Sequence, residues 1–388
     1  MKIFFSVGEP SADEHAAHLI EELHQRQPHC EFVGFGGEAM ANAGCQIIFR
    51  LTDLAVMGVL RVLPMLLKFY RVYRQAKRYF ETDRPDAVVL IDFPGFNWWV
   101  AKAAKREGIP VFYYLPPQLW AWGPWRIKRV RKYVDYVISG LSFEKRWYEE
   151  RGVQVEFVGH PFFDKVKKQS LDRIFIDQHR GDQPVVGILP GSRSMEIAKS
   201  WDVMLKIMHA LHSKHPQVRF LVANYKESHK HRCEKELQKL GWQLPIEFHI
   251  GKTSEIIELT DCCAMVSGSV SLEMLARRTP ACVVYRFKWW GYLGFRLFCS
   301  LKSITLPNLM SGKTILPEWL IVHRSDHVAV EISEMLASWI FDEKSQHKIL
   351  SQIDDLCAEE VKLGSAGNTA SFILEKLEAK VEEISKAA

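Results

Sequence analysis

The sequence predicts an α/β fold with two Rossmann-like, doubly wound domains that face each other across a cleft. The chain has 388 residues, enough for two domains of about 150–200 residues each. Short apolar runs alternate with helical stretches along most of the chain. The runs are about 10–20 residues apart, a spacing typical of parallel strands joined by crossover helices.

Two series of apolar runs are expected to form the strands. The first series is Ile3–Val7, Phe32–Phe35, Ala87–Asp92, Val111–Leu115, Tyr136–Ser139 and Val155–Val158. The second series is Val185–Leu189, Arg219–Ala223, Ile246–Ile250, Ala264–Ser267 and Ala281–Tyr285. The two series indicate an N-terminal domain over residues 1–165 and a C-terminal domain over residues 185–355. The polar stretch 166–184 is expected to link them, and helices in 356–388 are expected to pack back on the N-terminal domain.

Composition excludes several classes of protein. The eight cysteines form no C-x-x-C pair, which indicates reduced thiols in the cytoplasm and not a disulfide framework. No apolar run approaches the roughly 18 residues of a membrane-spanning helix. The net charge of +5 is modest, and no nucleic-acid-binding motif is present, so a nucleic acid is not an expected partner.

The turn after the first strand, GEPSAD, differs from a dinucleotide-binding loop. It carries one glycine, Gly8, where such loops carry three, and the carboxylates Glu9 and Asp13 flank Ser11. These two acids would repel a pyrophosphate. The bland alternative is that they are solvated acids at a helix start, where the helix dipole favours them.

Polar motifs follow other predicted strands, where doubly wound domains bind their ligands. Asp92 directly follows Ala87–Ile91, and the loop LPGSR supplies Ser192 and Arg193. The turn SGSVSLE opens a helix and contains Gly268, Ser269, Ser271 and Glu273. Backbone N–H groups at such a helix start suit a phosphate, and an arginine adds a bidentate clamp. Each motif alone also fits a capping acid, an ordinary β-turn or an ordinary helix start.

A metal site is not expected. The segment His229–Cys233 has ligand types at short spacing, but no second cluster completes a site. His160, before Pro161, fits a hydrogen-bonded strand-end histidine better than a catalyst.

The ordered motifs GEPSAD, LAVMGVLRVL, IDFPGFN, WAW, FVGHP, LPGSR, SGSVSLE and LPNLMSGK resemble the lipid A disaccharide synthase family. The match runs from Gly8 to about Glu318. The family consists of inverting glycosyltransferases with the two-domain GT-B architecture. The resemblance implies transfer of 2,3-diacylglucosamine from its UDP derivative to the 6-hydroxyl of 2,3-diacylglucosamine 1-phosphate (lipid X). The products would be the β-1,6-linked disaccharide and UDP, with no cofactor.

The resemblance also implies residue roles. Asp92 falls on the general base, and Arg193 and Asn308 fall on residues of the UDP-sugar site. Glu273 would accept the ribose hydroxyls. The N-terminal domain would hold the acceptor, so that Glu9, Ser11 and Asp13 meet sugar hydroxyls or orient Asp92.

The sequence departs from the family pattern in two places. Ala12 stands where related sequences have a glycine, and Trp98 and Trp99 are bulkier than usual. A left-handed backbone at Ala12 would cost on the order of 1 kcal/mol.

The segment Val59–Phe80 predicts contact with a membrane surface, because it contains six cations and no acid. Its apolar residues at helical spacing are Leu60, Leu63, Leu66, Leu67, Tyr70 and Tyr73. Its cations include Lys68, Arg71, Arg74 and Arg78 on an adjoining face, typical of a helix lying on anionic lipid. Aromatic and basic runs at Trp120–Lys132 and Tyr285–Phe298 support this interpretation. The alternative is a core helix with a solvated basic face.

The sequence therefore predicts an enzyme that is peripheral to the cytoplasmic face of the inner membrane. Two other functions stay open. One is a GT-B enzyme with a different nucleotide sugar or lipid acceptor, and the other is a non-catalytic, membrane-attached nucleotide-sugar binder. The sequence leaves the oligomeric state, including a homodimer, open.

Overall fold

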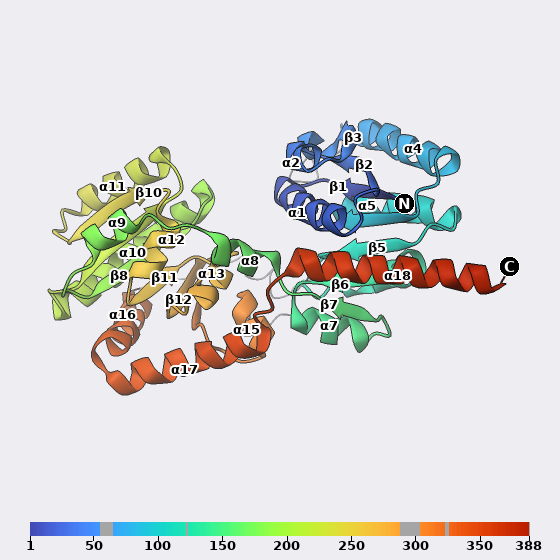
Figure 1. Ribbon diagram of the computed structural model, residues 1–388. Coiled ribbons are helices and arrows are strands. Elements are labelled where there is room, and N and C mark those ends of the chain that lie inside the picture. The colour runs from blue at the N-terminus through green and yellow to red at the C-terminus, as the bar shows by residue number, and fades with distance from the viewer. Residues whose placement is uncertain (55–64, 122, 288–302, 323–325, 388) are drawn as a thin grey trace. The chain divides into compact units, whose positions relative to one another are not determined.

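The computed structural model describes residues 1–54, 65–121, 123–287, 303–322 and 326–387 (Figure 1). The chain divides into two compact units. The first unit contains Met1–Asp164 and Lys362–Ala388, and the second contains Lys165–Val361. The predicted linker 166–184 therefore belongs to the second unit and carries a helix, α9 (Arg173–His179). The predicted boundary at residue 355 falls within the helix α17 (Glu343–Glu360).

The first unit is built on a seven-stranded parallel sheet with the order β3-β2-β1-β4-β5-β6-β7. Its strands are β1 (Lys2–Val7), β2 (Glu31–Gly36), β3 (Gln46–Arg50), β4 (Ala87–Ile91), β5 (Val111–Tyr114), β6 (Tyr136–Ser139) and β7 (Val155–Phe157). Its helices are α1 (Pro10–Arg26), α2 (Glu38–Asn42), η1 (Leu51–Leu54), α4 (Leu66–Thr82), α5 (Pro94–Arg106), η3 (Pro124–Arg126), α6 (Ile127–Tyr133), α7 (Ser142–Glu149) and α18 (Ser365–Ala387).

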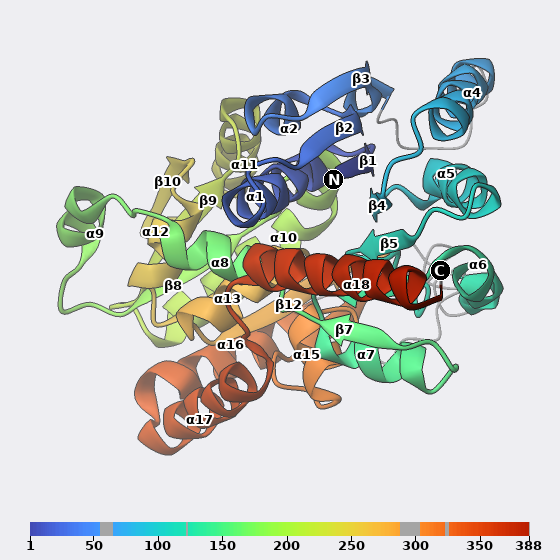
Figure 2. The same ribbon diagram turned by 45° about the vertical axis from the view of Figure 1, so that its right-hand side comes forward.

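Helices cover both faces of this sheet. Figure 2 shows α4, α5 and α6 on one face and α1 and α18 on the other. The two cores agree with this arrangement, because alternate residues of β1 enter different cores. Phe4 shares a core with α4 and packs on its Phe80 ring, while Phe5 shares the other core with Leu19 of α1. Burial on both faces explains why β4 reads as the uninterrupted apolar run AVVLI.

The second unit has a six-stranded parallel sheet with the order β10-β9-β8-β11-β12-β13. Its strands are β8 (Val185–Leu189), β9 (Arg219–Asn224), β10 (Ile246–Ile250), β11 (Cys262–Met265), β12 (Ala281–Arg286) and β13 (Glu318–Ile321). Its other helices are α10 (Ser194–Lys214), α11 (Glu227–Leu240), α12 (Thr253–Leu259), α13 (Val270–Arg277), α15 (Leu306–Ser311) and α16 (Asp326–Phe341). The helix α8 (Pro161–Lys168) contains the crossing between the units.

The predicted α/β fold with two doubly wound parallel sheets is confirmed. Every predicted strand is present, and each end lies within two residues of the predicted position. The edge strands β3 and β13 were not predicted. Both lie at the margin of a sheet, and their apolar runs, IIF and WLI, have only three residues each.

Both sheets reverse their strand order once, and this reversal locates the candidate sites. The order turns between β1 and β4 in the first unit and between β8 and β11 in the second. In doubly wound sheets, ligands bind outside the carboxyl ends of the strands at such a switch point. The loops there begin at Gly8 and Asp92 in the first unit, and at Pro190 and Val266 in the second.

Two further findings concern the predictions. Ala12 is buried inside α1, where alanine is the most favourable helix residue, so the strain considered for it does not arise. No helix in the described part of the chain combines the length and apolar character needed to cross a membrane.

Candidate functional site

The turn after β4 has an unusual backbone. Asp92 and Phe93 adopt φ values of 46° and 47°, in the left-handed region that residues with a side chain rarely occupy. Such a conformation costs on the order of 1–3 kcal/mol for each residue, and it persists only when the surroundings impose it. Strained residues of this kind cluster at active sites, which makes the turn a candidate site.

Buried hydrogen bonds hold this turn in place. The side-chain amide of Asn97 donates to the carbonyl oxygens of Asp92 (2.8 Å) and Ser6 (3.1 Å). The Ser6 hydroxyl donates to Asn97 Oδ1 (2.7 Å), and the Tyr113 hydroxyl donates to the Asp92 carbonyl (2.8 Å). Because Asn97 is fully buried, its bonds cannot be exchanged for water. The sequence predicted no role for Ser6, Asn97 or Tyr113. The asparagine of PGFN, a polar residue among aromatic ones in the first turn of α5, could have indicated one.

The turn after β1 lies beside the Asp92 turn. The ring of Phe93 occupies the space over Gly8, where an added Cβ would approach it to 2.2 Å, so this position requires glycine. Burial raises the pKa of the half-buried Glu9, and the charge of Asp92 raises it further. Burial likewise raises the pKa of Asp92, whereas the backbone N–H of Phe93 lowers it. A carboxylate with a raised pKa is a better proton acceptor, as a general base requires.

The two other residues predicted in this turn, Ser11 and Asp13, differ in solvent exposure. Ser11 is exposed in the first turn of α1. Asp13 is buried, and its carboxylate accepts hydrogen bonds from the backbone N–H groups of Gly37 (2.7 Å) and Ala39 (2.9 Å). It therefore ties the start of α2 to α1. Its expected contact with sugar hydroxyls stays a prediction.

The second unit has a pocket of about 250 Å³ at its switch point, beyond the carboxyl ends of β8, β9 and β11. The predicted residues that line it are Ser192, Arg193, Gly268 and Ser269. Arg193 is the N-cap residue of α10, and its side chain is 67% exposed. The lining residue Glu196, which sequence reasoning missed, accepts from the Arg193 backbone N–H (3.1 Å) and pairs with its guanidinium (3.3 Å). The pocket therefore has an exposed cation and small residues at the starts of α10 and α13.

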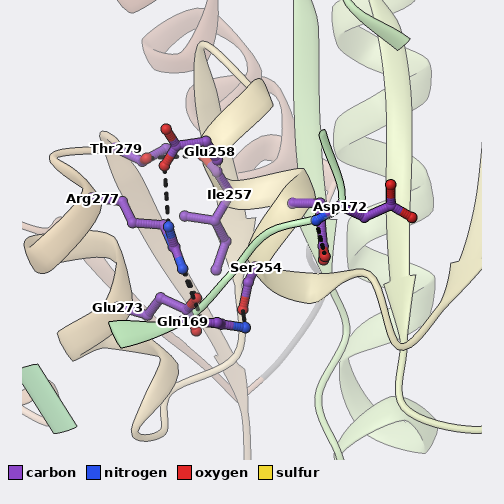
Figure 3. Close-up of polar contacts among 9 residues, drawn as sticks. Gln169, Asp172, Ser254, Ile257, Glu258, Glu273, Arg277 and Thr279 are labelled. Carbon is purple, nitrogen blue, oxygen red and sulfur yellow. Dashed lines mark hydrogen bonds and ion pairs between the residues drawn. The ribbon is translucent and has the colours of Figure 1, made fainter. Parts of the chain in front are cut away.

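Ser271 and Glu273 do not line this pocket. The buried Ser271 hydroxyl donates to the carbonyl of Gly268 (2.8 Å). Glu273 is buried and accepts from Arg277 Nε (3.0 Å), and Arg277 also bonds Glu258 (3.1 Å) and Gln169 (2.9 Å), as Figure 3 shows. Glu273 therefore takes part in an ion-pair network that ties α13 to its neighbours. Its expected ribose contact stays a prediction.

Asn308 is also occupied by structural bonds. Its amide nitrogen donates to the Leu316 carbonyl (2.7 Å) and to Glu318 (2.8 Å). Its Oδ1 accepts from the backbone N–H groups of Ile315 (2.8 Å) and Leu316 (2.9 Å). These bonds use the full capacity of an asparagine side chain, which is buried here. Asn308 therefore shapes the segment that leads into β13, and the structure does not place it in the expected UDP-sugar contact.

We expect Asn308→Ala to lower the free energy of unfolding by roughly 2–4 kcal/mol, because it leaves two buried N–H groups and a carbonyl unpaired. Thermal melting would measure the loss, with the exposed Asn42→Ala as the matched control. UDP affinity of the folded variant should stay within about threefold of wild type, less than one hydrogen bond is worth. A large loss of UDP affinity with an unchanged melting temperature would show that Asn308 contacts UDP.

Among the described residues, one group offers converging metal-ligand atoms: His179, Glu247 and His249, all within 4.8 Å of one another. It lies on α9 and on β10, the outer strand of its sheet, and not at the switch point. Arg219 lies 3.6 Å from the same carboxylate and competes with a metal for it. In the segment His229–Cys233, His229 contacts the Ser194 hydroxyl (3.1 Å). Neither the His179 group nor the segment His229–Cys233 contributes a residue to the described lining of the pocket at the switch point.

Comparisons with known proteins agree with the motifs. Residues 3–364 match the protein family described as Lipid-A-disaccharide synthetase. The Lipid-A-disaccharide synthase of Idiomarina loihiensis is 32% identical over 357 residues, covering 92% of this chain and 93% of that protein.

The solved structures share the fold at low sequence identity. S. aureus MnaA, in a co-structure with UDP, has a TM-score of 0.60 at 13% identity, with 98% of this chain and 97% of that chain covered. The calicheamicin glycosyltransferase CalG4 has a TM-score of 0.55 at 13% identity, with 98% of each chain covered.

Proposed function

Because the chain belongs to the lipid-A-disaccharide synthetase family, we propose that it transfers 2,3-diacylglucosamine from UDP to lipid X. The 6-hydroxyl oxygen of lipid X attacks the anomeric carbon of the donor sugar. The bond from that carbon to the diphosphate oxygen breaks, UDP leaves, and the hydroxyl proton passes to a base. Attack opposite the leaving group inverts the anomeric carbon and gives the β-1,6 linkage.

The observation that carries this proposal is the strained Asp92 turn at the switch point of the first unit. Asp92 is the proposed base, since its carboxyl has a raised pKa and its backbone is held by buried bonds. Glu9 and Ser11 lie in the adjoining turn and are proposed to bind acceptor hydroxyls. The acidic character of this site suits a sugar and disfavours a nucleotide diphosphate.

The pocket of the second unit is the proposed UDP site. The N-terminal ends of α10 and α13 line this pocket, and the dipoles of these helices favour an anion there. Arg193 would stabilise the negative charge that develops on the leaving diphosphate. S. aureus MnaA binds UDP in its co-structure, and the shared fold supports this assignment by analogy.

Arg193→Ala is expected to weaken UDP binding about 10- to 150-fold, the effect of losing a charged hydrogen bond of about 1.5–3 kcal/mol. Titration calorimetry with UDP measures this directly. Arg173→Ala, at an exposed position in the same unit, is the matched control and should bind UDP like wild type. If Arg193→Ala binds UDP with unchanged affinity, the loop LPGSR does not bind the phosphates.

We further propose that α4 docks the protein on the anionic cytoplasmic surface of the inner membrane. Its core face is Phe69, Val72, Ala76 and Phe80. A second apolar set, Leu66, Leu67 and Tyr70, is exposed at 43%, 74% and 51%. Lys68, Arg71, Arg74 and Arg78 are exposed on the same helix. A core helix needs only the first set, so the exposed set favours the interfacial interpretation over the alternative.

The other predicted membrane segments are partly described. Leu60 and Leu63 lie outside the described residues, as does most of Tyr285–Phe298. In Trp120–Lys132, Trp125 is 72% exposed next to the exposed Lys128 and Arg129. This second exposed aromatic and basic site is on the same face of the sheet as α4 (Figure 2).

The proposed function is tested with purified protein, UDP-2,3-diacylglucosamine and lipid X, by measuring UDP release and product mass. The expected product is the disaccharide in equimolar amount with UDP. If UDP is released with another acceptor but not with lipid X, the protein has a different GT-B activity. If it binds the UDP-sugar and releases no UDP with any acceptor, it is a non-catalytic binder.

A further inference from the structure

We propose that an apolar pocket beside the Asp92 turn binds an acyl chain of the acceptor. This inference rests on the proposed function and adds the position of the lipid. The pocket has a volume of about 270 Å³. It is lined by Leu54, Leu66, the rings of Phe69, Phe93, Phe96 and Trp99, and the backbone of Gly95.

The strained turn joins this pocket to the proposed base. Phe93 follows Asp92 directly, and the left-handed backbone at both residues turns the Phe93 ring over Gly8 and into the pocket wall. There the ring packs against Phe69 and Phe96, with centroids 6.1 Å and 6.4 Å away. A ligand in the pocket would therefore contact Phe93, the residue directly after the carboxyl that would deprotonate the acceptor hydroxyl.

The chemistry of the lining selects the occupant. Among the described lining residues, no side chain has a charged group, and the Trp99 indole N–H is the one polar hydrogen. A sugar or nucleotide buried there would lose its hydrogen bonds to water without replacing them. A hydrocarbon chain gains free energy in proportion to the apolar area it covers. Leu66 and Trp99 remain 43% and 38% exposed, so apolar surface is available at the opening.

The pocket is also continuous with the proposed membrane face. Leu66 lines the pocket and precedes Leu67, which is 74% exposed on α4. An acyl chain that leaves the bilayer at α4 would meet apolar side chains up to the Asp92 turn. This continuity favours an acyl chain of a membrane lipid over an apolar segment of another protein.

Gly95 provides a sharp test. An added Cβ at Gly95 meets nothing within 4 Å, and its φ is not in the left-handed region, so a side chain fits there without backbone strain. Because Gly95 lines the pocket, we expect Gly95→Leu to place a bulky side chain at its wall, whereas Gly95→Ala adds one carbon there. Leucine and alanine are also better helix residues than glycine in α5.

The experiment compares initial rates on lipid X analogues with long and with short acyl chains. For Gly95→Leu, we expect the ratio of kcat/KM for the long-chain analogue to that for the short-chain analogue to fall at least about tenfold. This is the effect of losing one or more methylene contacts. Gly95→Ala should change the ratio less than Gly95→Leu does, since its single added carbon leaves most of the pocket volume open. The melting temperature of each variant verifies folding.

An unchanged ratio in a folded Gly95→Leu variant overturns the proposal. If that variant does not fold, wild-type protein is photolabelled with a lipid X analogue that carries a diazirine at the chain end. Labelling within residues 93–99 supports the pocket, and labelling confined to other segments overturns it. Failure of the proposed function gives a different result, since wild-type protein would then form no disaccharide with either analogue.

Discussion

Asp92→Asn is expected to lower kcat by about 10²–10⁴, the usual contribution of a general base. Asparagine has nearly the same shape as aspartate and tolerates the left-handed backbone, so the turn should keep its conformation. What the variant loses is the ability to accept the proton of the attacking hydroxyl. UDP affinity should be unchanged, because the proposed UDP pocket consists of residues of the other unit.

Stability distinguishes this result from damage to the fold. Burial raises the folded-state pKa of Asp92 above the ordinary value of 3.8, so ionisation of this carboxyl destabilises the folded state at neutral pH. Asp92→Asn should therefore melt no lower than wild type at pH 7–8. Asp83→Asn, at an exposed position in the same unit, is the matched control for activity. Turnover within a few-fold of wild type would remove Asp92 from the role of base.

The same pKa shift predicts the acid side of the pH profile. The base form of Asp92 is lost as the pH falls through its raised pKa, so kcat/KM should begin to fall at a higher pH than for an ordinary aspartate. Asp92→Asn should abolish this acid limb along with most of the activity.

The sequence predicted the central strands and the position of Asp92 because both depend on local patterns. A run such as AVVLI can be buried on both faces only within a parallel sheet, and a polar residue right after it must lie at the carboxyl end. The residues that hold Asp92 are different in kind. Ser6 and Asn97 are 91 positions apart, and only the pairing of β1 with β4 brings them together.

Asp13, Glu273 and Asn308 show that residues of a motif can also hold the fold together. Each has a side chain that suits a sugar or nucleotide, and each lies in a family motif. In the structure, Asp13 binds backbone N–H groups that are 24 and 26 positions away, and Asn308 closes a loop back on itself. A family motif therefore includes residues that maintain the loop as well as residues that contact the ligand, and sequence spacing does not distinguish them.

The helix α4 was ambiguous in sequence for another reason. Two apolar sets alternate along it, and periodicity cannot tell which one packs on the sheet. Of the predicted stripe, Leu66, Leu67 and Tyr70 are exposed, Tyr73 is partly buried against the core, and Leu60 and Leu63 lie outside the described residues. Phe69 and Val72 of the other set enter the core. The structure thus leaves Leu66, Leu67 and Tyr70 available to lipid, with the four cations exposed on the same helix.

Changing Lys68, Arg71, Arg74 and Arg78 together to glutamate is expected to abolish co-sedimentation with anionic vesicles at low salt. Each near-surface cation contributes about 1 kcal/mol of attraction, so losing four weakens binding by about three orders of magnitude, and the added acids are repelled. Wild-type protein should sediment much less with neutral vesicles and dissociate partly at high salt, because salt screens these charges. Activity on vesicle-borne substrate should fall with sedimentation, while UDP affinity is retained.

A matched control separates local docking from net charge. The exposed Lys214, Lys239, Lys344 and Lys348 all belong to the second unit, and changing them to glutamate alters the net charge by the same amount. This control should still sediment with anionic vesicles if α4 is the docking element. Equal loss in both variants would mean that net charge alone governs binding. If the α4 variant sediments like wild type, α4 is not the anchor, and the exposed Trp125 with Lys128 and Arg129 becomes the next site to change, because it offers the same combination of an aromatic side chain and cations.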